Sequence, residues 1–128
     1  MIRIGAAVCL ALIVAGPASA RAERLPRHVG DCVVTHVKAV ETRLQDGDTP
    51  VAGSGSAIRF TNGGYQVSYE TVPAVEASRP GDPVRMCLNS IPEGCPPGDD
   101  RGRNYRVTNL RTHGHWWLPD AEHMCGGA

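Results

Sequence analysis

Three histidines near the C-terminus are the side chains whose spacing best suits metal chemistry. His113 and His115 are two positions apart, so on a strand they would share a face. His123 follows shortly afterwards, close to Asp120 and Glu122. Zinc and copper take such nitrogen and oxygen ligands. The pattern makes His113, His115 and His123 candidate ligands of a divalent metal, although His-x-His at a turn is more commonly a solvated loop.

A charged loop over residues 99–103 carries the second set of candidates. Asp99 and Asp100 are paired carboxylates, which together with a histidine could act as acid and base in a small hydrolase. The preceding Pro-Pro-Gly is ordinary turn chemistry, and Asp in a turn often accepts hydrogen bonds from its own backbone. With Arg101 and Arg103 nearby, we expect a turn held by Arg–Asp pairs, and Asp99, Asp100 and Arg101 are candidate binding residues.

Two adjacent tryptophans form the third set. Trp116 and Trp117 alternate on a strand, so one ring should face inward and the other outward. An exposed Trp can be a platform for a sugar or a peptide. In so small a domain, the simpler expectation is that both rings pack against the aromatic residues of the predicted hairpin around Asn62-Gly63-Gly64.

Signatures of nucleophilic catalysis and of cofactor binding are missing from the sequence. Ser54 and Ser56 lie among glycines, but no G-x-S-x-G elbow surrounds them. Neither a phosphate-binding loop nor a dinucleotide fingerprint occurs. We therefore expect no cofactor and do not favour an enzyme.

Residues 1–20 have the pattern of a secretory signal peptide. Arg3 is followed by an apolar run, the breaker Gly16-Pro17 and the small-x-small sequence Ala18-Ser19-Ala20. The alternative is a buried N-terminal helix, which would not require these features in this order. The run is too short to span a bilayer. The pattern predicts a periplasmic or secreted protein without a membrane anchor.

Four cysteines remain after such a cleavage, and an even number in a small exported domain predicts two disulfides. Three pairings are open to the sequence. We favour Cys87–Cys95, which closes a short loop, and Cys32–Cys125, which would tie the first strand to the tail. A zinc site is the weaker alternative because no C-x-x-C pair is present.

The charge of the mature chain is close to neutral. Without Arg3 it holds 12 basic and 13 acidic residues, a formal charge of −1. This balance gives no electrostatic footprint for nucleic acid. We expect a protein or a glycan of the cell envelope as the partner.

Alternating apolar residues predict several short strands. Residues 32–44 have some apolar residues at helical spacing, but their many β-branched side chains favour a long strand with a bulge. Asn62-Gly63-Gly64 is a turn between two alternating runs, which predicts a hairpin. Residues 45–55 are expected to be a loop and residues 72–78 a short helix. Three further strands are expected around Val84–Leu88, Tyr105–Val107 and Trp116–Leu118.

Together these elements predict an all-β fold with two disulfides and at most one short helix. The order suits a small OB-like barrel or a sandwich of five to six strands. We expect residues 21–30 to be a flexible lead-in and residues 31–128 to be a single β domain.

Several sequence blocks carry a resemblance to known proteins. The blocks SGSAIRFTNGGYQVSYE, GDPVRMCL, CPPGDDRGR and LPDAEHMCGGA resemble a family of uncharacterised small exported proteins of GC-rich bacteria. This resemblance implies an exported, cysteine-paired domain and no particular activity. SGSAIRF is also similar to the loop motif of periplasmic inhibitors of chicken-type lysozyme, in which it implies that Ser56 and Arg59 reach into the lysozyme cleft.

The favoured function is that of an exported, disulfide-stabilised β domain, a binding or structural module without catalysis. The alternatives are divalent-metal binding through the three histidines, lysozyme inhibition and a small hydrolase. Function has to be argued from a site rather than from a fold, so the position of each candidate decides between them.

Overall fold

The structure is a computed structural model that describes residues 12–16 and 23–127. The predicted cleavage site and most of the predicted signal peptide lie outside the described residues. Within these two ranges, no helix is long and apolar enough to cross a membrane.

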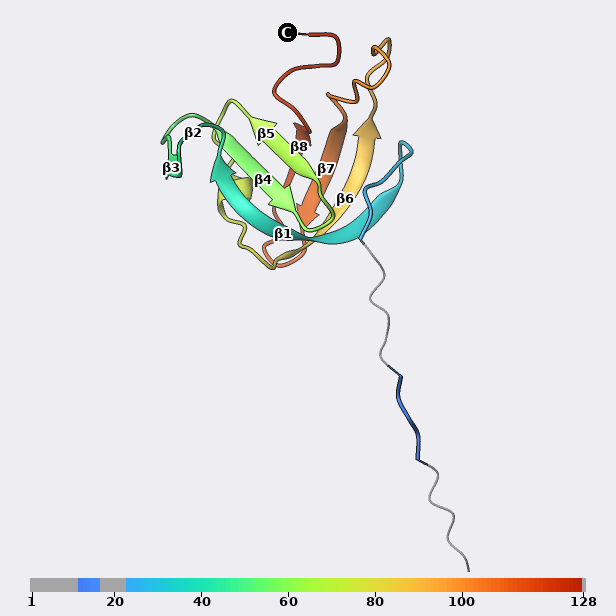
Figure 1. The fold of residues 1–128 in the computed structure, drawn as a ribbon. Coiled ribbons are helices and arrows are strands. Elements are labelled where there is room, and N and C mark those ends of the chain that lie inside the picture. The colour runs from blue at the N-terminus through green and yellow to red at the C-terminus, as the bar shows by residue number, and fades with distance from the viewer. Residues whose placement is uncertain (1–11, 17–22, 128) are drawn as a thin grey trace, which may run out of the picture.

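Eight strands and one short helix make up the described chain (Figure 1). The strands are β1 (Cys32–Thr42), β2 (Gln45–Asp46), β3 (Thr49–Pro50), β4 (Ser56–Phe60), β5 (Tyr65–Ser68), β6 (Pro83–Ser90), β7 (Asn104–Asn109) and β8 (His115–Pro119). The helix is α1 (Pro73–Glu76). Pro73 suits its first turn, where a backbone N–H has no helical partner. The predicted hairpin, helix and later strands are confirmed, while the expected loop over residues 45–55 contains the small β2–β3 hairpin.

β1 is the strand that organises the sheet. Its first half pairs with β6 and its second half with β4, both antiparallel. The register shifts between Val37 and Ala39, as the predicted bulge requires. A bulge increases local twist and bends a strand, so β1 can serve two partners that diverge around it. Figure 1 shows β1 as a long bent strand that runs from beside β6 to beside β4.

The six long strands form one curled antiparallel sheet, a half-barrel with the order β5-β4-β1-β6-β7-β8. The predicted all-β class and small-barrel shape are confirmed, and the sheet is a single curled layer rather than a sandwich. Its two edges, β5 and β8, are joined by the buried side chain of Gln66. The amide nitrogen of Gln66 donates to the carbonyl oxygens of Tyr105 and Leu118, both at 2.9 Å, and its oxygen accepts from the indole of Trp116 at 2.8 Å.

The core fills the concave side of this sheet. Alternate residues of the long strands point inward and are almost completely buried, and they include Val37, Ile58, Phe60, Val84, Met86, Leu88, Val107 and Trp116. Helix α1 adds Val75, which is fully buried, to the same cluster. Period-2 alternation thus places one set of side chains in the core and leaves the other set on the outer surface.

A buried polar network joins the segment between α1 and β6 to the end of β7. The carboxylate of Asp82 accepts hydrogen bonds from Arg111 at 2.6 Å and 2.9 Å and from the side chain of Asn109 at 2.9 Å. It also accepts from the backbone N–H of Arg79. Above all the Arg111 hydrogen bonds, which outweigh the cost of burial, hold the pKa of Asp82 well below its ordinary value of 3.8.

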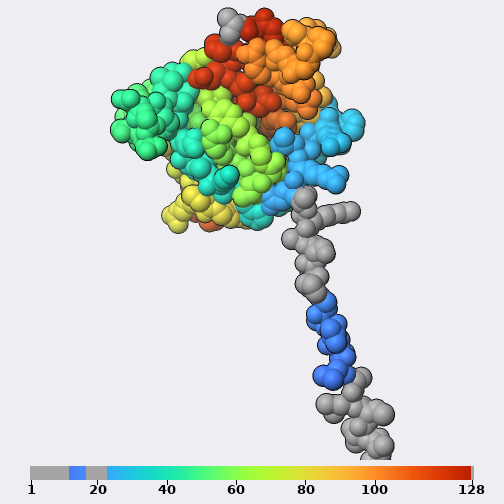
Figure 2. All heavy atoms as spheres, viewed as in Figure 1, coloured from blue at the N-terminus to red at the C-terminus, as the bar shows by residue number. Residues whose placement is uncertain are grey.

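Residues 23–30, expected to be a flexible lead-in, lie against the domain (Figure 2). The carboxylate of Glu23 accepts hydrogen bonds from Thr35 and Thr61 and contacts the ring nitrogen of His36. The Thr61 bond is the main reason why the pKa of Glu23 is lowered. Pro26 is buried. The composition of this segment gave no sign of these contacts.

Both cysteine pairs differ from the favoured prediction, which is wrong. The disulfides are Cys32–Cys87 and Cys95–Cys125. Cys32 lies directly opposite Cys87 in the β1–β6 register, with the two Cα atoms 4.0 Å apart. Because β6 runs on to Ser90, Cys87 is carried away from the loop that holds Cys95. Cys32 and Cys87 meet because β1 and β6, which are far apart in sequence, pair in the sheet.

Candidate functional site

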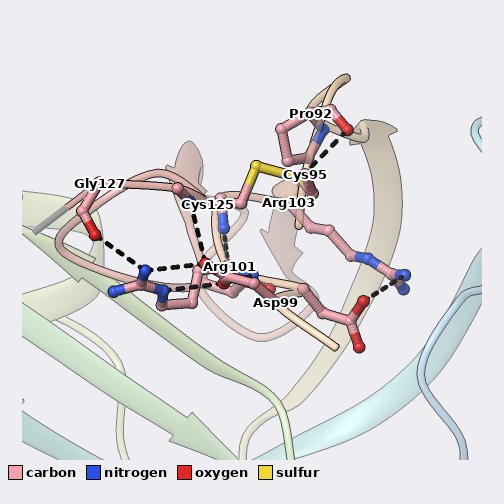
Figure 3. Close-up of a disulfide and its surroundings, with 11 residues drawn as sticks. Pro92, Cys95, Asp99, Arg101, Arg103, Cys125 and Gly127 are labelled. Atoms are coloured by element: carbon pink, nitrogen blue, oxygen red, sulfur yellow. Dashed lines mark hydrogen bonds and ion pairs between the residues drawn. A yellow bond between two sulfur atoms is a disulfide. The ribbon is translucent and has the colours of Figure 1, made fainter. Parts of the chain in front are cut away.

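The charged loop over residues 99–103 fastens the C-terminal tail. Arg101 donates two hydrogen bonds of 2.9 Å to Asp99 and one of 3.1 Å to the carbonyl of Gly127. Asp99 also accepts from the backbone N–H of Gly126 at 2.9 Å. Figure 3 shows these contacts beside the Cys95–Cys125 disulfide. The loop and the tail are therefore one clamp at this end of the molecule.

This clamp does not provide an acid and a base for hydrolysis. Hydrogen bonds from Arg101 and from Gly126 hold the pKa of Asp99 well below its ordinary value, so Asp99 cannot supply a proton near neutral pH. Asp100 is largely exposed, and its oxygen is 3.9 Å from Arg103. The expected turn with Arg–Asp pairs describes the arrangement better than a catalytic dyad.

Asp120 is the one carboxylate here with a raised pKa, and burial is the main cause. Its Oδ1 atom accepts the backbone N–H of Gly102 at 2.8 Å, and its own N–H donates to the carbonyl of Arg103. It lines an open hollow of about 650 Å³ together with residues 97–101. These bonds join the start of β7 to the end of β8, which is a structural role.

The three candidate histidines are not gathered around one point. His113 lies in the β7–β8 turn with a positive φ of 64°, His115 begins β8, and His123 is exposed in the tail. Within residues 12–16 and 23–127, no group of three His, Cys, Asp or Glu side chains could hold a metal ion. The arrangement gives no support to a metal site.

Ser56 and Arg59 are not placed as the resemblance to lysozyme inhibitors implies. Ser56 is fully buried, where its hydroxyl donates to Glu76 and accepts from the backbone N–H of Val72. Arg59 is exposed, but its guanidinium contacts Glu41 at 3.2 Å and lies over the ring of Tyr65. A buried Ser56 cannot reach into a partner's cleft, so this residue role does not transfer.

Trp116 and Trp117 are separated by the sheet. The ring of Trp116 is buried in the core, whereas Trp117 is 50% exposed on the opposite side. The expectation that both rings pack inside is wrong for Trp117, because strand alternation sends adjacent side chains to opposite faces. Trp117 is the candidate that the structure leaves available to a partner.

The surroundings of Trp117 define a surface that we call the outer face. It is the convex side of β1, β6, β7 and β8, and two rows of cross-strand neighbours form it. One row is Val34, Arg85, Thr108 and His115, and the other is Cys32, Cys87, Arg106 and Trp117. Most of these side chains are exposed, and Thr108 and Cys87 are half-buried.

Side-chain contacts within the outer face centre on Trp117. The guanidinium carbon of Arg106 lies 5.0 Å from the centroid of the Trp117 ring, a cation–π distance. The ring of His115 meets Trp117 edge-on, with centroids 5.4 Å apart. Cross-strand neighbours on one face interact in this way because the register holds their Cβ atoms close. Trp117 is therefore held in a defined place although it is half exposed.

The outer face is cationic and lacks acidic side chains. No residue of either row is Asp or Glu. In the described part of the chain, no carboxylate lies within ion-pair distance of Arg85 or Arg106. Asp31, which precedes β1, contacts His28, and Glu23 contacts His36. Two guanidinium groups are thus open to an anionic ligand.

Arg85 and Arg106 were not among the residues that the sequence singled out. Their signal was present, since each alternates with buried residues and must point outward. What the sequence could not show is that β6 and β7 are neighbours, which places both arginines beside Trp117.

Comparisons of the chain with protein-family models, with curated proteins and with solved structures found no match.

Proposed function

We propose that the mature protein is an exported, non-catalytic binding module that recognises a component of the cell envelope through the outer face. One observation carries this proposal: Trp117 is half exposed on a regular strand, beside an Arg106 that has no acidic partner in the described residues. Trp and Arg are the residue types that most often dominate binding surfaces.

The absence of catalysis is supported by how the reactive groups are used. The four cysteines of the described chain form disulfides, so they hold no thiolate nucleophile. Ser54 and Ser56 are buried, with hydroxyl groups that bond to neighbouring segments. Asp99 is occupied by Arg101. These groups stabilise the domain instead of converging on a substrate.

Export to the periplasm or beyond is supported by the signal-peptide pattern of residues 1–20 and by the two disulfides, which persist in oxidising compartments. In such a compartment the disulfides remain formed. They add rigidity to a small domain whose core is only modest in size. A rigid scaffold in turn lowers the entropy cost of binding through a surface of fixed side chains.

The test is co-sedimentation of the mature protein, exported from the full-length chain, with purified envelope polysaccharide and with isolated envelope fragments. Wild-type protein and Trp117→Ala are compared. Tyr69→Ala is the matched control, since Tyr69 is also an exposed aromatic residue beneath an arginine, but Arg43 there is paired with Glu122. We expect wild type and the control to sediment equally and Trp117→Ala to lose most binding. Equal sedimentation of all three proteins would refute a role for the outer face.

A further inference from the structure

We infer that the ligand of the outer face is an anionic glycan, a sugar chain that carries carboxylates at intervals. This inference rests on the proposed function and names its ligand class. It is carried by the combination of a half-exposed indole ring with two guanidinium groups on neighbouring strands.

The two arginines are placed to bind separate anions on one extended chain. Arg85 on β6 lies directly opposite Thr108 on β7. Arg106 is two residues from Thr108 on β7, so the two arginines are diagonal cross-strand neighbours. Such diagonal positions are roughly 7–8 Å apart on a sheet. Each guanidinium can hold a carboxylate through two parallel hydrogen bonds. The spacing suits a chain whose charges recur, rather than one compact anion.

Trp117 gives the part of the recognition that charge alone does not provide. An indole ring is a broad apolar surface with an electron-rich face, which suits the C–H groups of a sugar ring. Arg106 lies over this ring, so the carboxylate site and the apolar site adjoin. Thr108 adds a hydroxyl group between Arg85 and His115 in the neighbouring row. A sugar acid combines the apolar and anionic groups that these side chains would meet.

An acidic peptide is the less suitable occupant because its usual route is closed. Peptides commonly bind a sheet by adding a strand to its edge. The free edge of the sheet at β8 lies against β5, and the carbonyl of Leu118 on β8 already accepts a hydrogen bond from the side chain of Gln66. A peptide strand therefore cannot pair freely with this edge. A stable protein interface also needs about 800 Å² per partner, whereas the cationic part of the outer face is only two rows of side chains.

Nucleic acid is also a poor match for this surface. Tight nucleic-acid binding relies on many Lys and Arg contacts to successive phosphates. The mature chain is close to neutral overall, and the outer face offers two arginines and one histidine. A ligand with sparser charges and more apolar surface fits it better.

The Cys32–Cys87 disulfide lies in the same row as Arg106 and Trp117. It links β1 to β6 covalently at the side of the outer face farthest from β8. The disulfide thus anchors β6, which carries Arg85, and the antiparallel pairing of β6 with β7 holds Arg106 beside it, which limits the ordering that a ligand must impose.

Isothermal titration of the purified mature protein with short oligogalacturonate tests this inference. The comparison ligands are the methyl ester of the same oligomer, a neutral malto-oligosaccharide and an oligoglutamate peptide. We expect binding to oligogalacturonate with quenching of tryptophan fluorescence, and this binding should weaken as the salt concentration rises. Arg106→Gln should lower the affinity by about tenfold or more. Arg59→Gln is the matched control because Arg59 already has Glu41 as its partner, and it should bind like wild type.

The outcomes separate this inference from the proposed function. Equal affinity for the acid and its methyl ester, or an unchanged affinity in Arg106→Gln, would overturn the anionic-glycan inference. If Trp117→Ala still abolished sedimentation with envelope material in that case, the binding role of the outer face would stand. Tighter binding of oligoglutamate than of oligogalacturonate would make an acidic protein the ligand and would likewise overturn the inference.

Discussion

The two faces of β8 use the same residue type in opposite ways. On the concave side, Trp116 is 3% exposed and its indole N–H bonds to Gln66. On the convex side, Trp117 is half exposed and contacts Arg106 and His115. Trp116 has every polar group satisfied inside the protein, whereas Trp117 has neighbours that could also contact a ligand. The inner face therefore holds the half-barrel together, whereas the outer face presents its aromatic and cationic side chains to solvent.

The largest effect should come from the inner face. Trp116→Ala should lower the free energy of unfolding by about 3–5 kcal/mol, because it leaves a large cavity and removes a hydrogen bond from the buried Gln66. Urea denaturation followed by circular dichroism measures this change. A loss no greater than that of Trp117→Ala would show that the two faces do not differ as described.

The second effect concerns the buried carboxylate that extends the inner polar network. Asp82→Asn should reduce stability at neutral pH by about 1–3 kcal/mol, because a charged acceptor of several hydrogen bonds is replaced. The pKa of Asp82 is lowered in the folded protein, so its stabilisation exists above the ordinary value of 3.8 and disappears as the pH falls further.

Thermal unfolding of both proteins between neutral pH and about pH 2 checks this sign. The two stability curves should converge on the acid side. Asp100→Asn is the control, because Asp100 has an 83% exposed side chain and should show no such difference. A gap between wild type and Asp82→Asn that widened toward acid pH would contradict the argument.

The smallest effect on stability should come from the outer face. Trp117→Ala should change the free energy of unfolding by less than about 1 kcal/mol, since an exposed position on a strand loses little packing. The same substitution should remove most of the binding to envelope material. A large loss of stability would mean that Trp117 is a structural residue, and the comparison between the two faces would fail.

Much of the fold could be predicted from local sequence patterns. Alternation identified the strands around Ile58, Val84 and Tyr105, and β-branching decided that residues 32–42 form a strand with a bulge. The turn at Asn62-Gly63-Gly64 also followed from residue type, since Gly63 has a positive φ. These features depend on neighbours in sequence, which is why they could be predicted.

The candidate site was predictable only in part. One exposed tryptophan followed from alternation, but which of the two it was depended on which side of β8 the core occupies. The disulfides were predicted in number and wrong in pairing, because any of three pairings satisfies the same spacing.

Residue types and their spacing were enough to predict a disulfide-linked β domain, most of its strand positions and the turn of the β4–β5 hairpin. These follow from side-chain period, β-branching and glycine, which act over a few residues. Only the tertiary structure decided that Arg85, Arg106 and Trp117 share a face, that Gln66 closes the half-barrel and that Cys32 meets Cys87. Each of those contacts joins strands far apart in sequence, and strand order is set by the shared core rather than by any local pattern.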